Sequence, residues 1–336
     1  MILVTGGTGF LGAHLLYRLA LNEPEIIAIR RKESSTGLVE KIFSYYTGNT
    51  APLLNKIVWV EADILDIVSL EQAFQNVDYV YHAAAMVSFN PKDKKKLFEI
   101  NVEGTANIVN ISLAKKIKKL CHVSSIAALG RAGNDKITDE QSPWNKDAGI
   151  SNYSLSKLEA EREVWRGIAE GLNAVIVNPS VILGPGNWNA GSSKLFKIVH
   201  NGLKVYTKGV NGYIDVNDVA KAMIWLMKSN ISGERFVLNA ENISYKQLFD
   251  WIAASLKVPP PSIKASPFLS EITWRTLKFF SLFSGKTPFI TKETARTANS
   301  FHRYSSEKFL SVSQMKFTPV KKSITFASQC FLKETV

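Results

Sequence analysis

The stretch Val4-Thr5-Gly6-Gly7-Thr8-Gly9-Phe10-Leu11-Gly12 decides the fold. It joins a short apolar run, Ile2–Thr5, to a segment of helical apolar spacing, Gly12–Leu21, and so predicts a strand, a glycine turn and a helix. The three spaced glycines suit a tight turn, close approach of the backbone to a pyrophosphate, and close helix–strand packing. The free N–H groups of a helix N-terminus would hold the anion. We therefore predict a dinucleotide-binding loop; the alternative is a glycine turn that binds nothing.

The rest of the first half alternates short apolar runs with helical patterns, which favours parallel βαβ units. The runs are apolar without alternation, as expected of strands buried on both faces. Further strands are expected at Ile26–Ile29, Ile57–Val60, Tyr79–His82, Leu120–Ser124 and Ala174–Val177, with helices at Leu70–Phe74, Leu97–Lys115 and Ser154–Glu170. We predict an α/β fold: a doubly wound parallel sheet of the Rossmann type with a smaller C-terminal substrate lobe.

The character of the chain changes after Val177, where Gly and Pro residues mark loops. Later helices are expected at Lys194–His200, Val216–Lys228 and Tyr245–Leu256, a strand at Arg235–Leu238, and a core or lid segment at Trp274–Phe283. We expect residues 1–177 to form the dinucleotide-binding domain, with 204–228 returning to it. Residues 178–203 and 229–336 should form the substrate lobe.

Charge and composition exclude several classes of protein. The 336 residues carry a net charge of +12, and from Lys257 onward there are 13 basic and 4 acidic residues. This surplus suits an anionic ligand, a membrane surface or nucleic acid, but a solvated basic face is the simpler interpretation. No aromatic-interleaved nucleic-acid motif is present. The two cysteines, Cys121 and Cys330, offer neither a metal site nor a disulfide framework. With no leader and no membrane-spanning run, we expect a cytoplasmic protein without a metal.

The choice of dinucleotide is made where the second strand ends. An acidic residue there would accept the ribose hydroxyls, but here the strand runs into Arg30-Arg31-Lys32. Because arginine can bind a phosphate in a forked geometry, we predict NADP(H) rather than NAD(H). The alternative is a solvated basic loop. After the third strand Asp63-Ile64 would contact the adenine amine, and after the fourth the small residues Ala83-Ala84-Ala85 would admit a ribose.

Tyr153 and Lys157 are four residues apart and so lie on one face of a predicted helix. Hydride transfer at a carbinol needs a group that takes or gives the hydroxyl proton. A tyrosine is a poor base at neutral pH, and a nearby lysine cation lowers its pKa. The same spacing recurs at Tyr304 and Lys308, but that pair lies far from any nucleotide element and is interpreted as structural.

A third group should hydrogen-bond the substrate oxygen. Ser124 and Ser125 stand at the carboxyl end of the fifth strand, where open α/β sheets bind ligands. We assign Ser125 to the substrate, with Ser124 as the competitor. Asn101 begins a helical segment and is expected to orient Lys157 through water; the alternative is a simple cap or turn residue.

In their order along the chain, these motifs resemble the extended short-chain dehydrogenase/reductase family, also called the NAD-dependent epimerase/dehydratase family. Gly184-Pro185-Gly186 and residues 213–220 also match its later motifs, so the resemblance covers about residues 1–240. The dihydroflavonol 4-reductase and 3β-hydroxysteroid dehydrogenase branch is the most similar. The resemblance implies a catalytic set of Ser125, Tyr153 and Lys157, with Tyr153 as acid/base. The chain departs from the family at Asn178, where many members have arginine, often in those that act on nucleotide sugars.

The resemblance implies a reversible ketone–alcohol oxidoreductase that uses NADP(H) and a small, fairly apolar substrate. The alternatives are an NAD-dependent nucleotide-sugar epimerase or dehydratase, and a non-catalytic dinucleotide sensor. Family members often pair, so a homodimer is possible. The residues expected to contact the dinucleotide are Gly6, Thr8, Gly9, Phe10, Leu11, Gly12, Arg30, Arg31, Asp63, Ile64, Ala83, Ala84, Ala85, Lys157, Pro179 and Val181.

Overall fold

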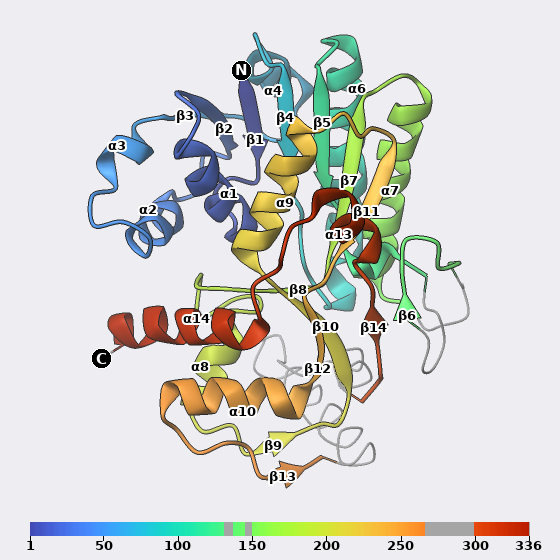
Figure 1. Cartoon of the computed structure of the whole chain (residues 1–336). Coiled ribbons are helices and arrows are strands. Elements are labelled where there is room, and N and C mark those ends of the chain that lie inside the picture. Colours follow the sequence, from blue (N-terminus) through green and yellow to red (C-terminus); the bar gives the residue numbers. More distant parts are fainter. Residues whose placement is uncertain (131–136, 145–149, 266–298, 336) are drawn as a thin grey trace.

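The computed structural model describes residues 1–130, 137–144, 150–265 and 299–335 (Figure 1). The predicted segment Trp274–Phe283 lies outside these residues. Where the chain is described, it holds no helix long and apolar enough to cross a membrane.

The centre of the molecule is a seven-stranded parallel sheet in the order β11-β7-β5-β4-β1-β2-β3, which confirms the predicted fold class. Its strands are β1 (Ile2–Thr5), β2 (Ile26–Arg30), β3 (Ile57–Glu61), β4 (Tyr79–His82), β5 (Lys119–Val123), β7 (Ala174–Pro179) and β11 (Glu234–Leu238). The strand order changes direction between β1 and β4, so a crevice opens at the carboxyl ends of these two strands.

Helices cover both faces of this sheet (Figure 1). One core packs under α1 (Phe10–Ala20), α2 (Gly37–Ser44) and α9 (Val216–Lys228); the other packs under α4 (Ile67–Ala73), α6 (Gly104–Ala114) and α7 (Asn152–Ala169). Neighbouring strand residues divide between them: Leu3 faces the second core and Val4 the first. Burial on both faces explains why the strands read as unbroken apolar runs.

The predicted helix Leu97–Lys115 is divided in the structure. A short helix α5 (Lys94–Phe98) is followed by a π-helical turn, Glu99–Glu103, and then by α6. A π turn inserts an extra residue into the helix and is frequent at functional sites. Here it carries Asn101. The short pieces α3 (Ala51–Leu54), η1 (Pro91–Asp93) and η3 (Ile126–Ala128) complete the connections of this half.

The part of the chain predicted to form the substrate lobe contains a small sheet in the order β12-β10-β8. Its strands are β8 (Val181–Leu183), β10 (Val210–Asp215) and β12 (Glu241–Ser244), and a third core packs them against α8 (Lys194–His200), α10 (Tyr245–Leu256) and α14 (Val320–Thr335). Two short parallel pairs flank it: β9 (Val205–Tyr206) with β13 (Ile263–Lys264), and β6 (Ile137–Thr138) with β14 (Arg303–Tyr304). The helix α13 (Glu307–Ser313) leads towards α14.

Two details differ from the expected division of the chain. Strand β11 lies in the range 229–336 expected for the lobe, yet it pairs with β7 at the edge of the large sheet. Its residues Phe236, Val237 and Leu238 are buried, and a parallel sheet covered on both faces provides that burial. Within 204–228, α9 packs on the large sheet and Ile214 of β10 joins the same core, whereas the strand pairing of β9 and β10 is with β13 and β8.

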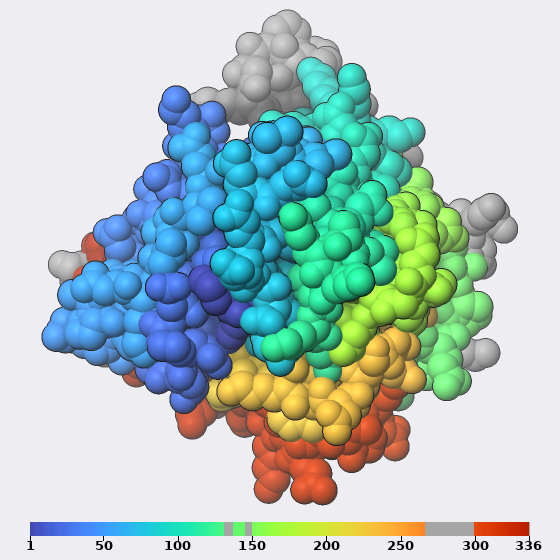
Figure 2. All heavy atoms as spheres, turned by 90° about the horizontal axis from the view of Figure 1, so that it is seen from above, coloured from blue at the N-terminus to red at the C-terminus, as the bar shows by residue number. Residues whose placement is uncertain are grey.

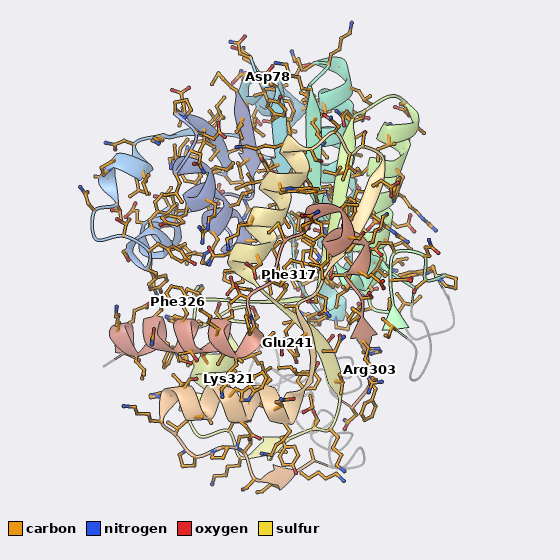
Figure 3. All side chains as sticks on the ribbon, viewed as in Figure 1. Asp78, Glu241, Arg303, Phe317, Lys321 and Phe326 are labelled. Atoms are coloured by element: carbon orange, nitrogen blue, oxygen red, sulfur yellow. The ribbon has the colours of Figure 1, made fainter. Side chains whose placement is uncertain are left out.

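The helix α14 joins the two halves. In Figure 3 Phe326 and Lys321 are labelled on it, and the Phe326 ring stacks on Tyr46 beside α2 at 5.5 Å. Near the C-terminal end of α14, Glu334 forms an ion pair with Lys41 of α2. Seen from above, the dinucleotide half forms most of the molecular face, with the C-terminal segment in red at its margin (Figure 2).

Candidate active site

The glycine turn has the shape that a pyrophosphate loop requires. Gly6 has φ +69°, and a Cβ there would lie 2.6 Å from the Ala84 backbone nitrogen. A Cβ on Gly12 would overlap the Gly6 carbonyl oxygen. Helix α1 begins after Gly9, which has no side chain to cap the first N–H groups. These donors and the helix dipole suit an anion, so the residues present fit the diphosphate of a dinucleotide.

A chain of hydrogen bonds fixes the second wall of the crevice. The Ala84 N–H donates to Thr5 Oγ1, which is 2.7 Å from His82 Nδ1. His82 Nε2 is 3.0 Å from Thr105 Oγ1, and that hydroxyl donates to the Asn101 carbonyl. Because the Thr105 hydroxyl gives its proton to the Asn101 carbonyl, it accepts a hydrogen bond from His82, and the imidazole proton is therefore assigned to Nε2. Burial lowers the pKa of His82 to about 3, so it is neutral and acts as a rigid spacer between the strand ends.

Asn101 is tied to the protein rather than directly to Lys157. Its Oδ1 accepts the Met86 N–H at 2.7 Å, and its Nδ2 donates to the Met86 carbonyl and to Ser156 Oγ. Ser156 Oγ in turn donates to the Tyr153 carbonyl at 2.8 Å. Asn101 therefore connects the loop after β4 with the first turn of α7. Its expected action on Lys157 through water stays a prediction.

Tyr153, Lys157 and Ser125 are brought together by α7 and the end of β5. Ser151 caps the N-terminus of helix α7, where its Oγ accepts the Ser154 N–H at 2.8 Å. One turn after Tyr153, Lys157 Nζ donates to the Val123 carbonyl at 2.8 Å, two residues before Ser125. The Ser125 hydroxyl lies near enough to the Tyr153 phenol to lower the pKa of that group.

Burial sets the protonation of these groups. It raises the pKa of Tyr153, and the nearby Ser125 hydroxyl opposes that rise. Burial lowers the pKa of Lys157 to about 8, and the nearby Glu161 carboxylate opposes that fall. At neutral pH the site therefore holds a phenol that can give a proton, next to a lysine that is mostly cationic.

The two serines of the strand end have different partners. Ser125 Oγ accepts the Ala127 N–H and lies beside Tyr153, whereas Ser124 Oγ donates to Glu161 at 2.6 Å. The geometry thus favours Ser125 over Ser124 as the group that faces a substrate.

The expected dinucleotide contacts lie around the same sheet edge. Arg30 NH1 donates to the Ser34 carbonyl at 3.2 Å, and Arg31 is exposed. Asp63 Oδ1 accepts the Leu65 N–H, so this carboxylate also shapes its own turn. Of the remaining expected contacts, Ile64 and Pro179 are buried, Ala83, Ala84 and Val181 are half-buried, and Ala85 is exposed. Each remains a predicted contact.

Sequence reasoning missed Glu161. It lies four residues after Lys157 and eight after Tyr153, which places it on the same face of α7. A buried carboxylate at helical spacing from a predicted catalytic pair is a signal that the sequence contains. Its partner Arg235, on β11, could be found only from the fold, because 74 residues separate the two.

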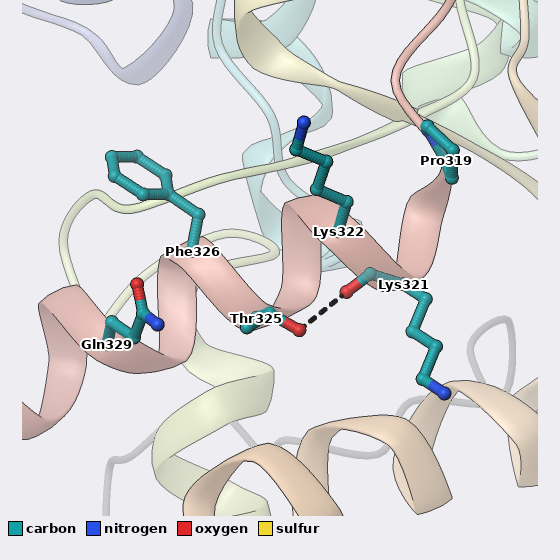
Figure 4. A pocket seen from close by; sticks show the side chains of 6 residues that line it. All are labelled: Pro319, Lys321, Lys322, Thr325, Phe326 and Gln329. Atoms are coloured by element: carbon teal, nitrogen blue, oxygen red, sulfur yellow. Dashed lines mark hydrogen bonds between the residues drawn. The ribbon is translucent and has the colours of Figure 1, made fainter.

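A surface hollow of about 620 Å³ lies elsewhere, along α14 (Figure 4). It is lined by Pro319, Lys321, Lys322, Thr325, Phe326 and Gln329. The hollow is shallow, and its side chains include no tyrosine, histidine or carboxyl group that could exchange a proton with the lysines. This hollow therefore adds no candidate acid or base to the predicted pair of Tyr153 and Lys157.

Comparisons with known proteins show the family to which the chain belongs. Residues 2–239 match the model of the NAD-dependent epimerase/dehydratase family, and the chain belongs to that family. Its members are NAD(P)-dependent oxidoreductases or epimerases that act on small molecules, so this chain is an NAD(P)-dependent enzyme of the extended short-chain dehydrogenase/reductase type. The predicted resemblance is thereby confirmed.

The relatives include several reductases. A Synechocystis protein whose name suggests a dihydroflavonol 4-reductase is 28% identical, with 98% of this chain and 93% of that protein covered. Cinnamoyl-CoA reductase 1 of Petunia hybrida is 27% identical over 73% of this chain and 74% of its own length. The solved structure of gox2253 has a TM-score of 0.82 at 26% identity, covering 100% of this chain and 98% of that one. A UDP-glucose 4-epimerase of Thermotoga maritima, at 19% identity and a TM-score of 0.78, shares the fold; the alignment covers 100% and 99% of the two chains.

Proposed function

We propose that this protein is an NADP(H)-dependent reductase that interconverts a ketone and a secondary alcohol on a small, fairly apolar substrate. The observation that carries the proposal is geometric: Tyr153 and a buried Lys157 lie one turn apart on α7, and Lys157 Nζ donates to the Val123 carbonyl, two residues before Ser125. When bound, the dinucleotide supplies or accepts the hydride.

The protein's own residues handle the proton. In the reducing direction Tyr153 gives its proton to the carbonyl oxygen of the substrate, and Ser125 donates a hydrogen bond to the same oxygen. Lys157 keeps a positive charge beside the phenolate that forms and so lowers its energy. Burial supports this direction, because it keeps the phenol protonated near neutral pH.

Apolar side chains border the phenol on the substrate side. The Phe89 ring meets the Tyr153 ring edge-on at 5.5 Å, and its side chain is 39% exposed. Val87, two residues earlier, is 63% exposed. Because exposed apolar groups beside a reacting centre gain by being covered, these residues favour an apolar substrate. The reductase names among the relatives support the same class.

The preference for NADP(H) rests on the end of β2. Arg30 and Arg31 are the two cations that follow the buried part of this strand, and no carboxyl group stands between Ile29 and Lys32. A guanidinium pair suits a 2′-phosphate, whereas an acidic residue would suit the free hydroxyls of NAD.

The test is turnover of the purified protein on a panel of ketones, with NADPH or NADH oxidation followed by absorbance. We expect NADPH to be oxidised faster than NADH at equal concentration. The epimerase alternative would show itself by tightly retained NAD, no net dinucleotide oxidation, and conversion of a nucleotide sugar. Dinucleotide binding with no turnover on either kind of substrate would instead favour the sensor.

A further inference from the structure

Glu161 is a buried carboxylate that the proposed chemistry does not use. Its side chain is 1% exposed and that of its partner Arg235 is 22% exposed, with 2.9 Å between Arg235 NH1 and Glu161 Oε1. A buried charge is costly unless hydrogen bonds and an opposite charge satisfy it. Glu161 has four such donors. Oε1 accepts from Arg235 and from Trp165 Nε1, and Oε2 accepts from Ser124 Oγ and Asn178 Nδ2.

Three of these donors come from the neighbouring strands β5, β7 and β11 (Figure 1). Ser124 directly follows β5, Asn178 lies near the carboxyl end of β7, and Arg235 is the second residue of β11. Ser124 directly precedes Ser125. Asn178 Nδ2 divides its two protons between Glu161 at 2.8 Å and the Ser125 carbonyl at 3.1 Å. The backbone on both sides of Ser125 is thus held by groups that depend on one carboxylate.

Arg235 extends the network to a further loop. Its Nε and NH2 both donate to the Glu140 carbonyl, and the Glu140 carboxylate accepts the Val237 N–H at 2.7 Å. The guanidinium is therefore locked by two partners and cannot follow Glu161 if that residue moves.

We propose that Glu161 is a positioning residue, which holds the Ser125 loop against the helix that carries Tyr153 and Lys157. Among the described residues it forms no hydrogen bond with the phenol or with the lysine, so it acts through Ser124 and Asn178. The inference rests on the proposed function, since it assigns a role within the same site. A small displacement of a group that orients a substrate is enough to reduce turnover greatly.

Glu161→Gln tests the proposal. A glutamine fills the same space but offers only one acceptor oxygen, so either the Arg235 side or the Ser124 side faces an amide NH2 group. We expect kcat to fall by about 10- to 100-fold while the Kd for NADPH stays within about twofold. Glu163→Gln is the matched control: it makes the same change two residues later on α7, at a half-exposed ion pair with Arg166, and should leave kcat unchanged.

A second readout separates positioning from mere packing. The Lys157 ammonium faces Glu161 on its own helix and His82 and His122 on β4 and β5, and burial keeps both histidines neutral near pH 7. Glu161 is the neighbour that opposes the loss of the lysine proton. In Glu161→Gln the alkaline fall in kcat should therefore move to lower pH.

The outcomes distinguish the two proposals. If the wild type oxidises NADPH and Glu161→Gln matches Glu163→Gln in kcat and pH profile, the positioning role is wrong and the reductase stands. A kcat that falls only in proportion to the fraction of protein able to bind NADPH, with no shift of the pH profile, also overturns it. A wild type without turnover overturns the reductase and this role together. Should Glu161→Gln not fold, Ser124→Ala removes one donor and keeps the ion pair; an unchanged kcat in that variant would equally refute the proposal.

Discussion

The two ends of the dinucleotide crevice are built in opposite ways. At the ends of β5 and β7, the polar groups are buried, and Ser124 Oγ, Lys157 Nζ and Asn178 Nδ2 each donate a hydrogen bond to the protein. Within the described residues, both ring nitrogens of His122, Asn178 Oδ1 and Ser180 Oγ are buried without a hydrogen bond. At the end of β2, Arg30 has one backbone partner and Arg31 is exposed. Under the proposed function, the first arrangement would fix the atoms where a bond is made, and the second would leave exposed charges where a phosphate is to be held. Substitutions should therefore be costly in the first region and mild in the second.

The largest effect is expected at Tyr153. Tyr153→Phe removes the proton donor but keeps the ring that packs on Phe89, so kcat should fall by about 10²- to 10⁴-fold. Dinucleotide binding should persist, which a fluorescence titration with NADPH can measure. Retained turnover would mean that the buried region does not hold the acid.

The glycine turn is the next most sensitive feature. Gly12→Ala places a Cβ against the Gly6 carbonyl oxygen, and the backbone must shift to admit it. We expect the free energy of unfolding to fall by about 1–3 kcal/mol, and NADPH binding to weaken by about tenfold or more. Gly48→Ala is the control, because a Cβ there meets no atom within 4 Å. Urea denaturation and NADPH titration of both variants test this prediction. Equal unfolding free energies and equal NADPH affinities for the two variants would contradict it.

Buried histidines on β4 and α1 make the stability of the protein sensitive to acid. Burial lowers the pKa of His82 to about 3 and that of His14 to about 4, against 6.5 for the exposed side chain. Between these values and pH 6.5 the unfolded chain binds more protons than the folded one. The contribution of the histidines to the free energy of unfolding is therefore complete above pH 6.5 and is lost as the pH falls towards the folded pKa values.

When the pH falls from 7 to 5, each buried histidine should lower the free energy of unfolding by roughly 2 kcal/mol. Burial also lowers the pKa of His122, so three histidines contribute to the loss. Urea titrations at the two pH values measure it, and His82→Gln should reduce it by about a third. A stability that does not change over this range would show that the imidazoles are not buried in neutral form.

Most of the fold could be predicted because its signals are local. The runs Ile2–Thr5 and Tyr79–His82 and the helices Lys194–His200, Val216–Lys228 and Tyr245–Leu256 have the predicted bounds. The beginning of β5 could not be predicted. It includes Lys119, whose buried ammonium is satisfied by the Leu226 and Ser229 carbonyls at the end of α9. Such a partner, more than 100 residues away, is visible only once the chain is folded.

The same distinction applies to the candidate site. Tyr153 and Lys157 could be paired from helical spacing, and Ser125 could be placed from its strand end. The partners that hold them, Glu161 and Arg235, meet only because β11 joins the large sheet. The π turn at Asn101 likewise leaves no periodic signal, since the apolar pattern continues through it.

The mildest effect is expected at the end of β2. Replacing Arg30 and Arg31 together by alanine removes two charges that have few partners, so the unfolding free energy should change by less than about 1 kcal/mol. The KM for NADPH should rise by about tenfold, while the KM for NADH and both kcat values stay nearly constant. Arg162→Ala, an exposed arginine paired with Glu159 on α7, controls for the loss of surface charge. If the KM values for NADPH and NADH rose equally, the two arginines would not recognise the 2′-phosphate. If kcat fell instead, the exposed end of the crevice would be as tightly coupled to the chemistry as the buried one.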